Sequence, residues 1–273
     1  FDRHGTPNER MRAYYMLGSV YRDLGEMPKA LDCFLIATEK ADTTGDCDYR
    51  VLLAIYGQMA DIYHAQYLPE DELRALLQSE HFAWKANDTI AAIKAYELRE
   101  RPYYFQNDTD AIIRIEHEAR ERYLKAGKTD YAGRALVVSV SLYLSRGQYD
   151  EAWKAMQIVE NESGWFDDNG NVRKGKEQYY YDKGRYCLGT GKPDSARIYF
   201  HRALAANRKE AGYKGLMTYY QYMQIPDSIA KYAQLFAIAN DSCYYSVNQE
   251  KVHQISAMYD YTRSLKNAAK EAQ

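Results

Sequence analysis

The chain has 273 residues, 46% hydrophobic and 27% charged, which excludes a disordered protein and fits a globular one. Its 36 basic and 38 acidic side chains leave a formal charge of −2. Nucleic-acid-binding proteins usually carry a clear basic excess, so this balance argues against nucleic acid as a partner. No apolar run in the sequence approaches the roughly 18 residues needed to span a bilayer.

The chain begins with Phe1 rather than Met. That start indicates a mature or trimmed part of a longer protein. We therefore expect contact with a membrane only through segments absent from this chain, such as a membrane-spanning helix.

The first predicted elements form a pair of helices joined by a tight turn. Residues 9–24 carry apolar side chains at helical spacing, and Pro28 is well placed in the first turn of the next helix. Gly18 and Ala30 have little or no side chain, which lets the two helices approach closely. We expect a large residue at either position to wedge the pair open, at a cost of about 1–3 kcal/mol.

The second and third pairs are less regular. In the second pair, Tyr67 stands where the first pair has its turn glycine. The third pair is predicted as a short helix near 89–100, a break at Arg101-Pro102 and a helix near 109–126. These departures indicate repeats that have diverged from a common pattern.

Similar triplets occur at three places, Asn87-Asp88-Thr89, Asn107-Asp108-Thr109 and Asn240-Asp241-Ser242. Side-chain oxygens of Asp, Ser and Thr accept the unpaired backbone N–H groups at helix N-termini. We therefore interpret each triplet as the end of one helix and the start of the next.

The later part of the chain continues the pattern. A regular fourth hairpin is predicted over 130–160, and a polar insertion at 164–175 precedes a fifth hairpin over 176–207. The sixth, over 209–239, is weaker, because Ile225 replaces the turn glycine.

The last segment, 242–273, reads as one long helix with apolar residues at spacings of mostly three and four. A terminal helix commonly covers the last apolar face of a stack of repeats, and a long one can continue as a stalk. We therefore divide the chain into a helical repeat domain, residues 1–241, and a capping or stalk helix, residues 242–273.

One spacing of small, aromatic and large residues recurs in three hairpins. Its copies are Gly18, Tyr21, Gly25, Ala30, Phe34 and Ala37; Val140, Tyr143, Gly147, Ala152, Met156 and Val159; and Gly184, Cys187, Gly191, Ala196, Phe200 and Ala203. Such periodicity is typical of a protein built from stacked helical hairpins.

The pattern resembles the tetratricopeptide repeat (TPR), in which Leu-Gly and Tyr on the first helix precede Ala, Phe and Ala on the second. The first hairpin matches it closely with Leu17, Gly18, Tyr21, Ala30 and Phe34, whereas the fifth has Lys183 in place of the Leu. This resemblance implies an all-α fold, a right-handed α-solenoid of about six TPR-like hairpins plus the long C-terminal helix. It also implies a non-catalytic scaffold that binds a protein or peptide segment.

Tyrosine is the compositional outlier, with 28 residues. Tyrosine-rich hairpins and a long terminal helix are similar to the extracytoplasmic TPR regions of bacterial membrane-anchored regulators. That similarity implies a sensor or interaction region on the periplasmic side of a membrane. A cytoplasmic TPR adaptor is the alternative.

In TPR proteins the first helices of successive hairpins line a concave binding face. The resemblance therefore implies a set of groove residues that mixes aromatic rings, arginines and small polar side chains: Arg12, Tyr15, Ser19, Arg22, Asp61, His64, Arg134, Val137, Tyr181, Arg185, Tyr219 and Tyr222. Tyrosine rings stack on apolar side chains, and guanidinium groups bind carboxylates or carbonyls, so the mixture suits a peptide.

Signatures of catalysis and metal binding are weak. His117-Glu118 begins like a zinc-protease helix, but Glu121 stands where the second histidine is needed. Asp61 and His64 lie one helical turn apart, yet two ligands do not complete a metal site. We therefore expect no catalytic residue, metal or cofactor, and an enzyme built on a helical toroid is the less favoured alternative.

Overall fold

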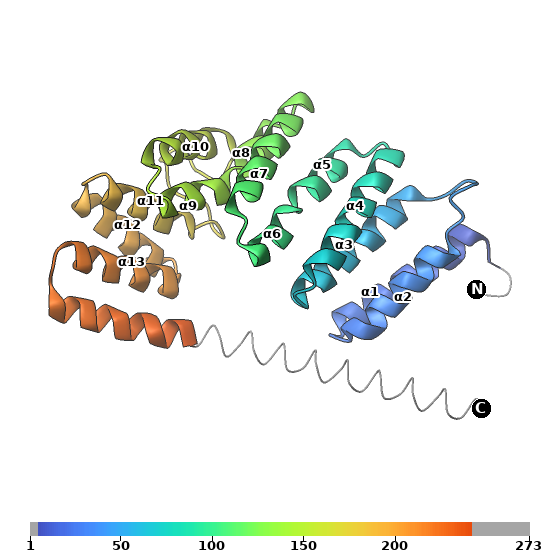
Figure 1. The fold of residues 1–273 in the computed structure, drawn as a ribbon, viewed down its shortest axis with the longest axis horizontal. Helices are drawn as coiled ribbons and strands as arrows, with labels where there is room; N and C mark the ends of the chain where they lie inside the picture. The colour runs from blue at the N-terminus through green and yellow to red at the C-terminus, as the bar shows by residue number, and fades with distance from the viewer. Residues whose placement is uncertain (1–4, 242–273) are drawn as a thin grey trace. The chain divides into compact units, whose positions relative to one another are not determined.

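The structure is a computed structural model that describes residues 5–241 (Figure 1). In this part of the chain every regular element is an α-helix, apart from an isolated antiparallel bridge between Phe166 and Val172. The prediction of an all-α helical repeat is therefore confirmed. The predicted terminal helix over 242–273 lies outside the described residues, and the proposed domain boundary is not tested.

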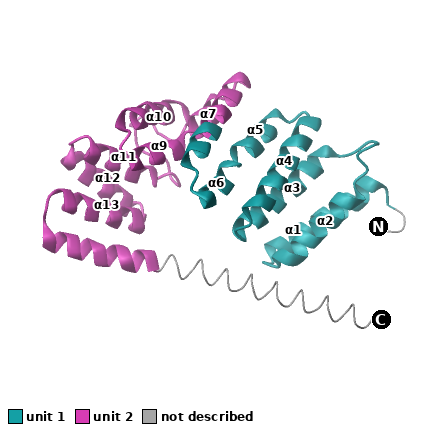
Figure 2. Cartoon of the chain, viewed as in Figure 1, with its two compact units in different colours: residues 1–115, 247–273 teal, residues 116–246 magenta. Residues whose placement is uncertain are grey.

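The described chain forms two compact units, residues 5–115 and residues 116–241 (Figure 2). Helices of the first unit are α1 (Pro7–Asp23), α2 (Met27–Lys40), α3 (Tyr49–Ala65), α4 (Pro69–Lys85), α5 (Thr89–Glu97), α6 (Glu100–Gln106) and the start of α7 (Thr109–Lys125). Two successive hairpins, α1 with α2 and α3 with α4, make the most extensive helix–helix contacts in this unit.

The second unit contains the end of α7 and six further named helices. These are α8 (Thr129–Arg134), α9 (Val137–Ser145), α10 (Tyr149–Glu162), α11 (Tyr179–Gly189), α12 (Pro193–Ala205) and α13 (Lys209–Tyr222). Another helix begins at 226 and continues to 241, the last described residue. Helix α10 packs on α8 and α9, α11 packs on α12, and α13 packs on both α11 and α12.

A ring of the second helix lies against a glycine of the first in two hairpins. Gly18 of α1 faces Phe34 of α2, and a Cβ atom added to this glycine would lie 2.6 Å from the ring. Gly184 of α11 faces Phe200 of α12 in the same way, and Gly215 of α13 meets that ring as well. Both phenylalanines are fully buried. The close approach predicted from Gly18 is therefore present.

The tight turns between helices share one conformation. The residue two places before the next helix has positive φ in each, namely Gly25, Tyr67, Asn87, Asn107, Gly127, Gly147, Gly191, Asn207 and Gln224. The following N–H donates to a carbonyl five residues earlier, as from Glu26 to Tyr21 at 2.8 Å and from Lys192 to Cys187 at 2.8 Å. This is the Schellman arrangement that ends a helix without leaving its last carbonyls unpaired.

The two Asn-Asp-Thr triplets each end one helix and cap the start of the next. Asn87 adopts positive φ, and the Asp88 carboxylate accepts a hydrogen bond of 3.0 Å from the N–H of Ala91. Asp108 does the same for Ala111 at 2.9 Å. In the third triplet Asn240 and Asp241 lie in a helix, and Ser242 lies outside the described residues, so the predicted start of a new helix there is not tested.

Two turn predictions are corrected by the backbone. Gln224, not Ile225, takes the position of the turn glycine, with φ of 56°. The helix break does not lie at Arg101-Pro102. Helix α5 ends earlier, at Glu97, and Pro102 lies in the first turn of α6. A proline fits there because the N–H groups of a helix's first turn have no partner within the helix.

The first helix of the fourth hairpin is split between α8 and α9, contrary to the regular helix predicted over this stretch. A buried carboxylate stabilises the split. Glu116 of α7 accepts hydrogen bonds from the N–H groups of Val138, at 3.2 Å, and Ser139, at 2.5 Å. These N–H groups belong to the first turn of α9. Without Glu116 they would have no hydrogen-bond partner inside the protein.

We predict that Gln224→Gly raises the free energy of unfolding by about 0.5–1 kcal/mol, because glycine adopts positive φ without steric cost. Gln224 is exposed, so little packing is lost. The reverse change at an equivalent exposed turn, Gly147→Gln, should cost about 1 kcal/mol. Urea denaturation measures the free energy of unfolding of both variants. A Gln224→Gly protein less stable than the wild type would contradict the prediction.

Candidate functional site

The residues predicted on α1 are engaged mainly in contacts within unit 1. Arg12 forms an ion pair with Asp48, just before α3. Ser19 donates its hydroxyl to the carbonyl of Tyr15, at 3.0 Å, and the Tyr15 ring packs on Phe34 at 6.1 Å between centroids. These side chains therefore connect and support the helices.

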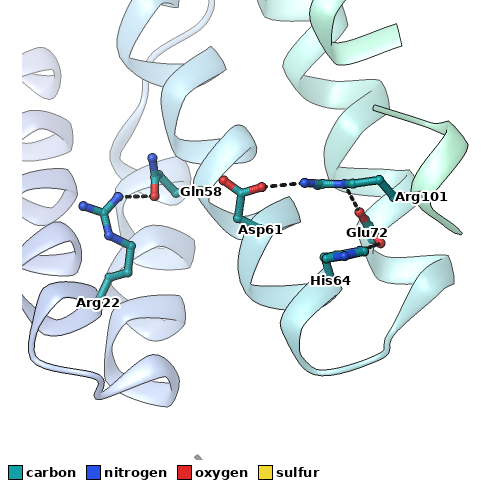
Figure 3. Close-up of polar contacts among 6 residues, drawn as sticks. All are labelled: Arg22, Gln58, Asp61, His64, Glu72 and Arg101. Carbon is teal, nitrogen blue, oxygen red and sulfur yellow. Dashed lines mark hydrogen bonds and ion pairs between the residues drawn. The ribbon is translucent and has the colours of Figure 1, made fainter. Parts of the chain in front are cut away.

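Figure 3 shows the polar contacts of the other predicted residues of unit 1, Arg22, Asp61 and His64. Arg22 donates to the side-chain oxygen of Gln58 on α3. Arg101 of α6 donates to Asp61, with an Nη1–Oδ1 distance of 2.9 Å, and to Glu72, with an Nε–Oε1 distance of 2.6 Å. The second carboxylate oxygen of Glu72 lies 3.0 Å from Nδ1 of His64.

This network explains why Asp61 and His64 lie one turn apart. Glu72 is completely buried, and a buried carboxylate needs partners that compensate its lost hydration. Arg101 and His64 supply them, and Asp61 balances part of the arginine charge. The two residues that could have begun a metal site therefore serve the pairing of α3, α4 and α6.

Three of the groove residues predicted in unit 2 make contacts inside the protein instead. Arg134 donates to the carbonyl of Ser163 at 2.9 Å and to Asp130 at 2.9 Å. Val137 packs against the apolar core formed by α9, α10 and α11. Tyr219 is only 6% exposed and contacts the Tyr220 ring.

The remaining predicted residues come together at one cavity. A groove of about 640 Å³ lies between α9, α10, α11, α12 and α13, and Tyr181, Arg185 and Tyr222 line it. Its other walls include Leu144, Leu188, Phe200, Tyr149, Thr218 and Gln221. Three of these helices, α9, α11 and α13, are first helices of their hairpins, as the groove prediction requires.

Arg185 is held in place by several hydrogen bonds. Its Nη1 donates to the hydroxyl and the carbonyl of Ser141, at 3.0 and 3.3 Å, and its Nη2 donates to the Ser145 hydroxyl at 2.8 Å. Its guanidinium also lies 5.5 Å from the centre of the Tyr181 ring. An arginine fixed in this way presents its charge at a defined place in the groove.

Two glycines let rings of neighbouring helices pack closely in the wall of this groove. A Cβ atom at Gly189 would overlap the ring of Tyr149, and one at Gly215 would overlap Phe200. Sequence reasoning missed Tyr149, Thr218 and Gln221. The spacing of Thr218, Gln221 and Tyr222 on one face of α13 is a signal that could have indicated two of them.

A buried acid lies beside the groove. Asp182 of α11 is 8% exposed and accepts a hydrogen bond of 3.1 Å from Nη1 of Arg185. Burial raises the pKa of Asp182 to about 6, although the Arg185 charge and hydrogen bonds from Arg185 and Ser141 act in the opposite direction. The native protein therefore binds a proton at Asp182 more tightly than the unfolded chain does.

We predict a pH-dependent difference in stability between Asp182→Asn and the wild type. A carboxyl with a raised native pKa favours folding when protonated, and this advantage is lost as pH rises from about 4 to about 6. The asparagine variant lacks that loss. The difference in the free energy of unfolding, variant minus wild type, should therefore be roughly 1–3 kcal/mol larger at pH 7 than at pH 4.5.

Urea denaturation at pH 4.5 and pH 7 measures this difference in the free energy of unfolding. Asp194→Asn, on the exposed side of α12, is the control. A gap between Asp182→Asn and the wild type that does not change with pH would contradict the account.

The described residues contain neither a cluster of metal-binding side chains nor a helix able to cross a membrane. Within residues 5–241, no three His, Cys, Asp or Glu side chains gather as a metal site would require. Over the same part of the chain, no helix combines the length and the apolar character needed to cross a membrane.

Comparison with known proteins identifies the repeats. A family model of the tetratricopeptide repeat matches residues 12–39, in unit 1, and residues 177–210, in unit 2. The solved structure of BtubC (BKLC) from P. vanneervenii is 14% identical, covering 87% of this chain and 93% of that chain, but its TM-score of 0.24 is too low to support any argument. A comparison with curated proteins finds no match.

Proposed function

Because the chain carries tetratricopeptide repeats in both units, we propose that it is a non-catalytic scaffold whose unit 2 groove binds a polypeptide segment. The observation that carries this proposal is the meeting of Tyr181, Arg185 and Tyr222 at one cavity. Repeats of this type typically bind proteins or peptides.

The chemistry of the groove suits an extended segment with an apolar anchor. Leu144, Leu188 and Phe200 line the groove with apolar side chains, and Gly189 and Gly215 let the rings of Tyr149 and Phe200 pack into its wall. Arg185 supplies a guanidinium held at a fixed place, with Asp182 balancing part of its charge, and such a group favours a carbonyl or a carboxylate next to that anchor. Tyr222 is 53% exposed and can close over the bound segment.

Within this function, we propose that the chain is the sensor or interaction region of a bacterial membrane-associated regulator, on the extracytoplasmic side. The similarity of its tyrosine-rich hairpins, in a chain with 28 tyrosines, to the sensor regions of such regulators supports this choice over a cytoplasmic adaptor. Protease digestion of intact cells that produce the full-length protein distinguishes the two locations.

We predict that selection of a random phage-displayed peptide library on the wild-type protein enriches peptides that bind in this groove. Their affinity, measured by fluorescence polarisation, should fall about tenfold in Tyr222→Ala, because exposed aromatic anchors dominate such interfaces. The control is Trp153→Ala on α10, which removes a ring of similar exposure, 45%, that does not line the groove.

The proposal fails if no peptide is enriched, or if the selected peptides bind Tyr222→Ala as tightly as they bind the wild type. A loss of affinity in Trp153→Ala equal to that in Tyr222→Ala would also exclude this groove as the site.

A further inference from the structure

A second cavity, of about 410 Å³, lies in unit 1, where the end of α3 and the following turn meet α6. Its walls include the rings of His64, Tyr67, Tyr104 and Phe105. A volume of this size is within the range of ligand sites, about 300–1,000 Å³, and holds a single aromatic ring. None of these residues belongs to the groove of unit 2. The peptide-binding proposal therefore does not account for this cavity.

Aromatic rings form much of the wall, in more than one orientation. The Tyr67 and Phe105 rings are 5.0 Å apart and meet at 69°, and the His64 ring is 5.5 Å from Phe105 at 50°. Tyr67 and Tyr104 keep 50% and 51% of their surface exposed, so a ligand can reach them. Aromatic pairs favour tilted and edge-to-face contacts at about 4.5–7 Å between centroids, so a further ring can extend this cluster.

The backbone holds one of these rings at a conformational cost. Tyr67 has φ of 58°, in the left-handed region where the equivalent turns of the chain mostly have glycine or asparagine. The turn itself does not need a tyrosine, since glycine would adopt this conformation without the steric cost. What the tyrosine supplies is its ring, which lies on Phe105 at the cavity.

The charged side chains around the cavity favour a neutral ligand. Arg101 binds Asp61 through Nη1 and Glu72 through Nε, and the second Glu72 oxygen faces His64. Glu100 also has an interaction partner in the protein, and its Oε2 is inaccessible to solvent. A charged ligand would therefore lose its hydration without meeting an unpaired charge on this wall.

One polar atom of the wall can still receive a hydrogen bond. Nδ1 of His64 lies 3.0 Å from the Glu72 carboxylate, which accepts only, so this nitrogen carries the hydrogen. In the neutral ring Nε2 is then an acceptor, and no hydrogen bond engages it within residues 5–241. Since the His64 side chain is 38% exposed, a ligand that carries an O–H or N–H donor can reach it.

The apolar surface continues beyond the cavity. Leu68, next to Tyr67 in the sequence, and Phe105 each keep 39% of their surface exposed. A small free molecule would fill the cavity and leave this surrounding surface in water, whereas a polypeptide covers both.

We propose that this cavity binds an aromatic side chain that carries a hydrogen-bond donor, such as the phenol of tyrosine, presented by a partner polypeptide. The ring lies among Tyr67, Tyr104 and Phe105, and its hydroxyl donates to Nε2 of His64. The choice of a polypeptide as the source of the ring rests on the proposed function, whereas the affinity for a neutral phenol does not.

The test uses the whole chain and ligand-observed NMR titration of small probes at pH 8, where an imidazole is uncharged. The probes are the Nα-acetyl amides of tyrosine, phenylalanine and cyclohexylalanine. The tyrosine probe should bind at least about threefold more tightly than the phenylalanine probe, because its hydroxyl donates to His64. The phenylalanine probe should bind about threefold more tightly than the cyclohexylalanine probe, because only an aromatic ring makes edge-to-face contacts.

A further probe, p-cresol, separates a free small molecule from a side chain. It carries the phenol of tyrosine without the backbone, so tighter binding of p-cresol than of the tyrosine probe would overturn the assignment to a polypeptide.

Variants locate the binding. Tyr104→Ala should weaken the tyrosine probe by about threefold to tenfold, whereas Tyr222→Ala, in the groove of unit 2, should leave its affinity unchanged. His64→Asn keeps an amide N–H that can donate to Glu72 but removes Nε2. The tyrosine and phenylalanine probes should therefore bind this variant equally.

Equal binding of these two probes to the wild type, a His64→Asn protein that keeps the preference for tyrosine, or no saturable binding of any probe would overturn the proposal. If His64→Asn fails to fold, the probe series and Tyr104→Ala still decide it. Because the groove is tested by Tyr222→Ala and the selected peptides, either proposal can fail without the other.

Discussion

A phenylalanine ring lying directly on a glycine of the neighbouring helix is the contact from which the arrangement of the hairpins follows. Phe34 meets Gly18 in unit 1, and Phe200 lies between Gly184 and Gly215 in unit 2. The ring gains its burial only because the opposing helix has no side chain at that point. In unit 2 the ring also contacts the next hairpin, through Gly215, so one residue fixes both the pairing within a hairpin and the stacking of two hairpins.

The groove of unit 2 depends on the same contact. Phe200 and Gly215 are part of its lining, so the ring that holds α11, α12 and α13 together also gives the groove an apolar wall. Arg185 directly follows Gly184 on α11 and lies one turn before Gly189, and its hydrogen bonds to Ser141 and Ser145 join α11 to α9. A site assembled from several first helices therefore needs the hairpins to stack in register.

The local features of this fold could be predicted from the sequence, and the reasons are physical. Gly18 and Gly184 were found because their spacing to Phe34 and Phe200 repeats, and Tyr67 was correctly placed at a turn. Gln224 was missed, because nothing in its side chain marks positive φ. Long-range pairs could not be predicted: Arg101 joins Asp61 and Glu72 from far along the chain, and Glu116 reaches the start of α9. Tyr219 fits the groove spacing, but the neighbouring hairpin buries it.

The most direct measurement is a double-mutant cycle on Gly184 and Phe200, using the free energy of unfolding. Gly184→Ala alone should cost about 1–3 kcal/mol, because the new methyl group overlaps the ring. Combined with Phe200→Leu, which removes the overlapping ring atoms, Gly184→Ala should cost at least about 1 kcal/mol less than it does in the wild type. Strictly additive costs would contradict the account, since they would show that the glycine and the ring do not depend on each other.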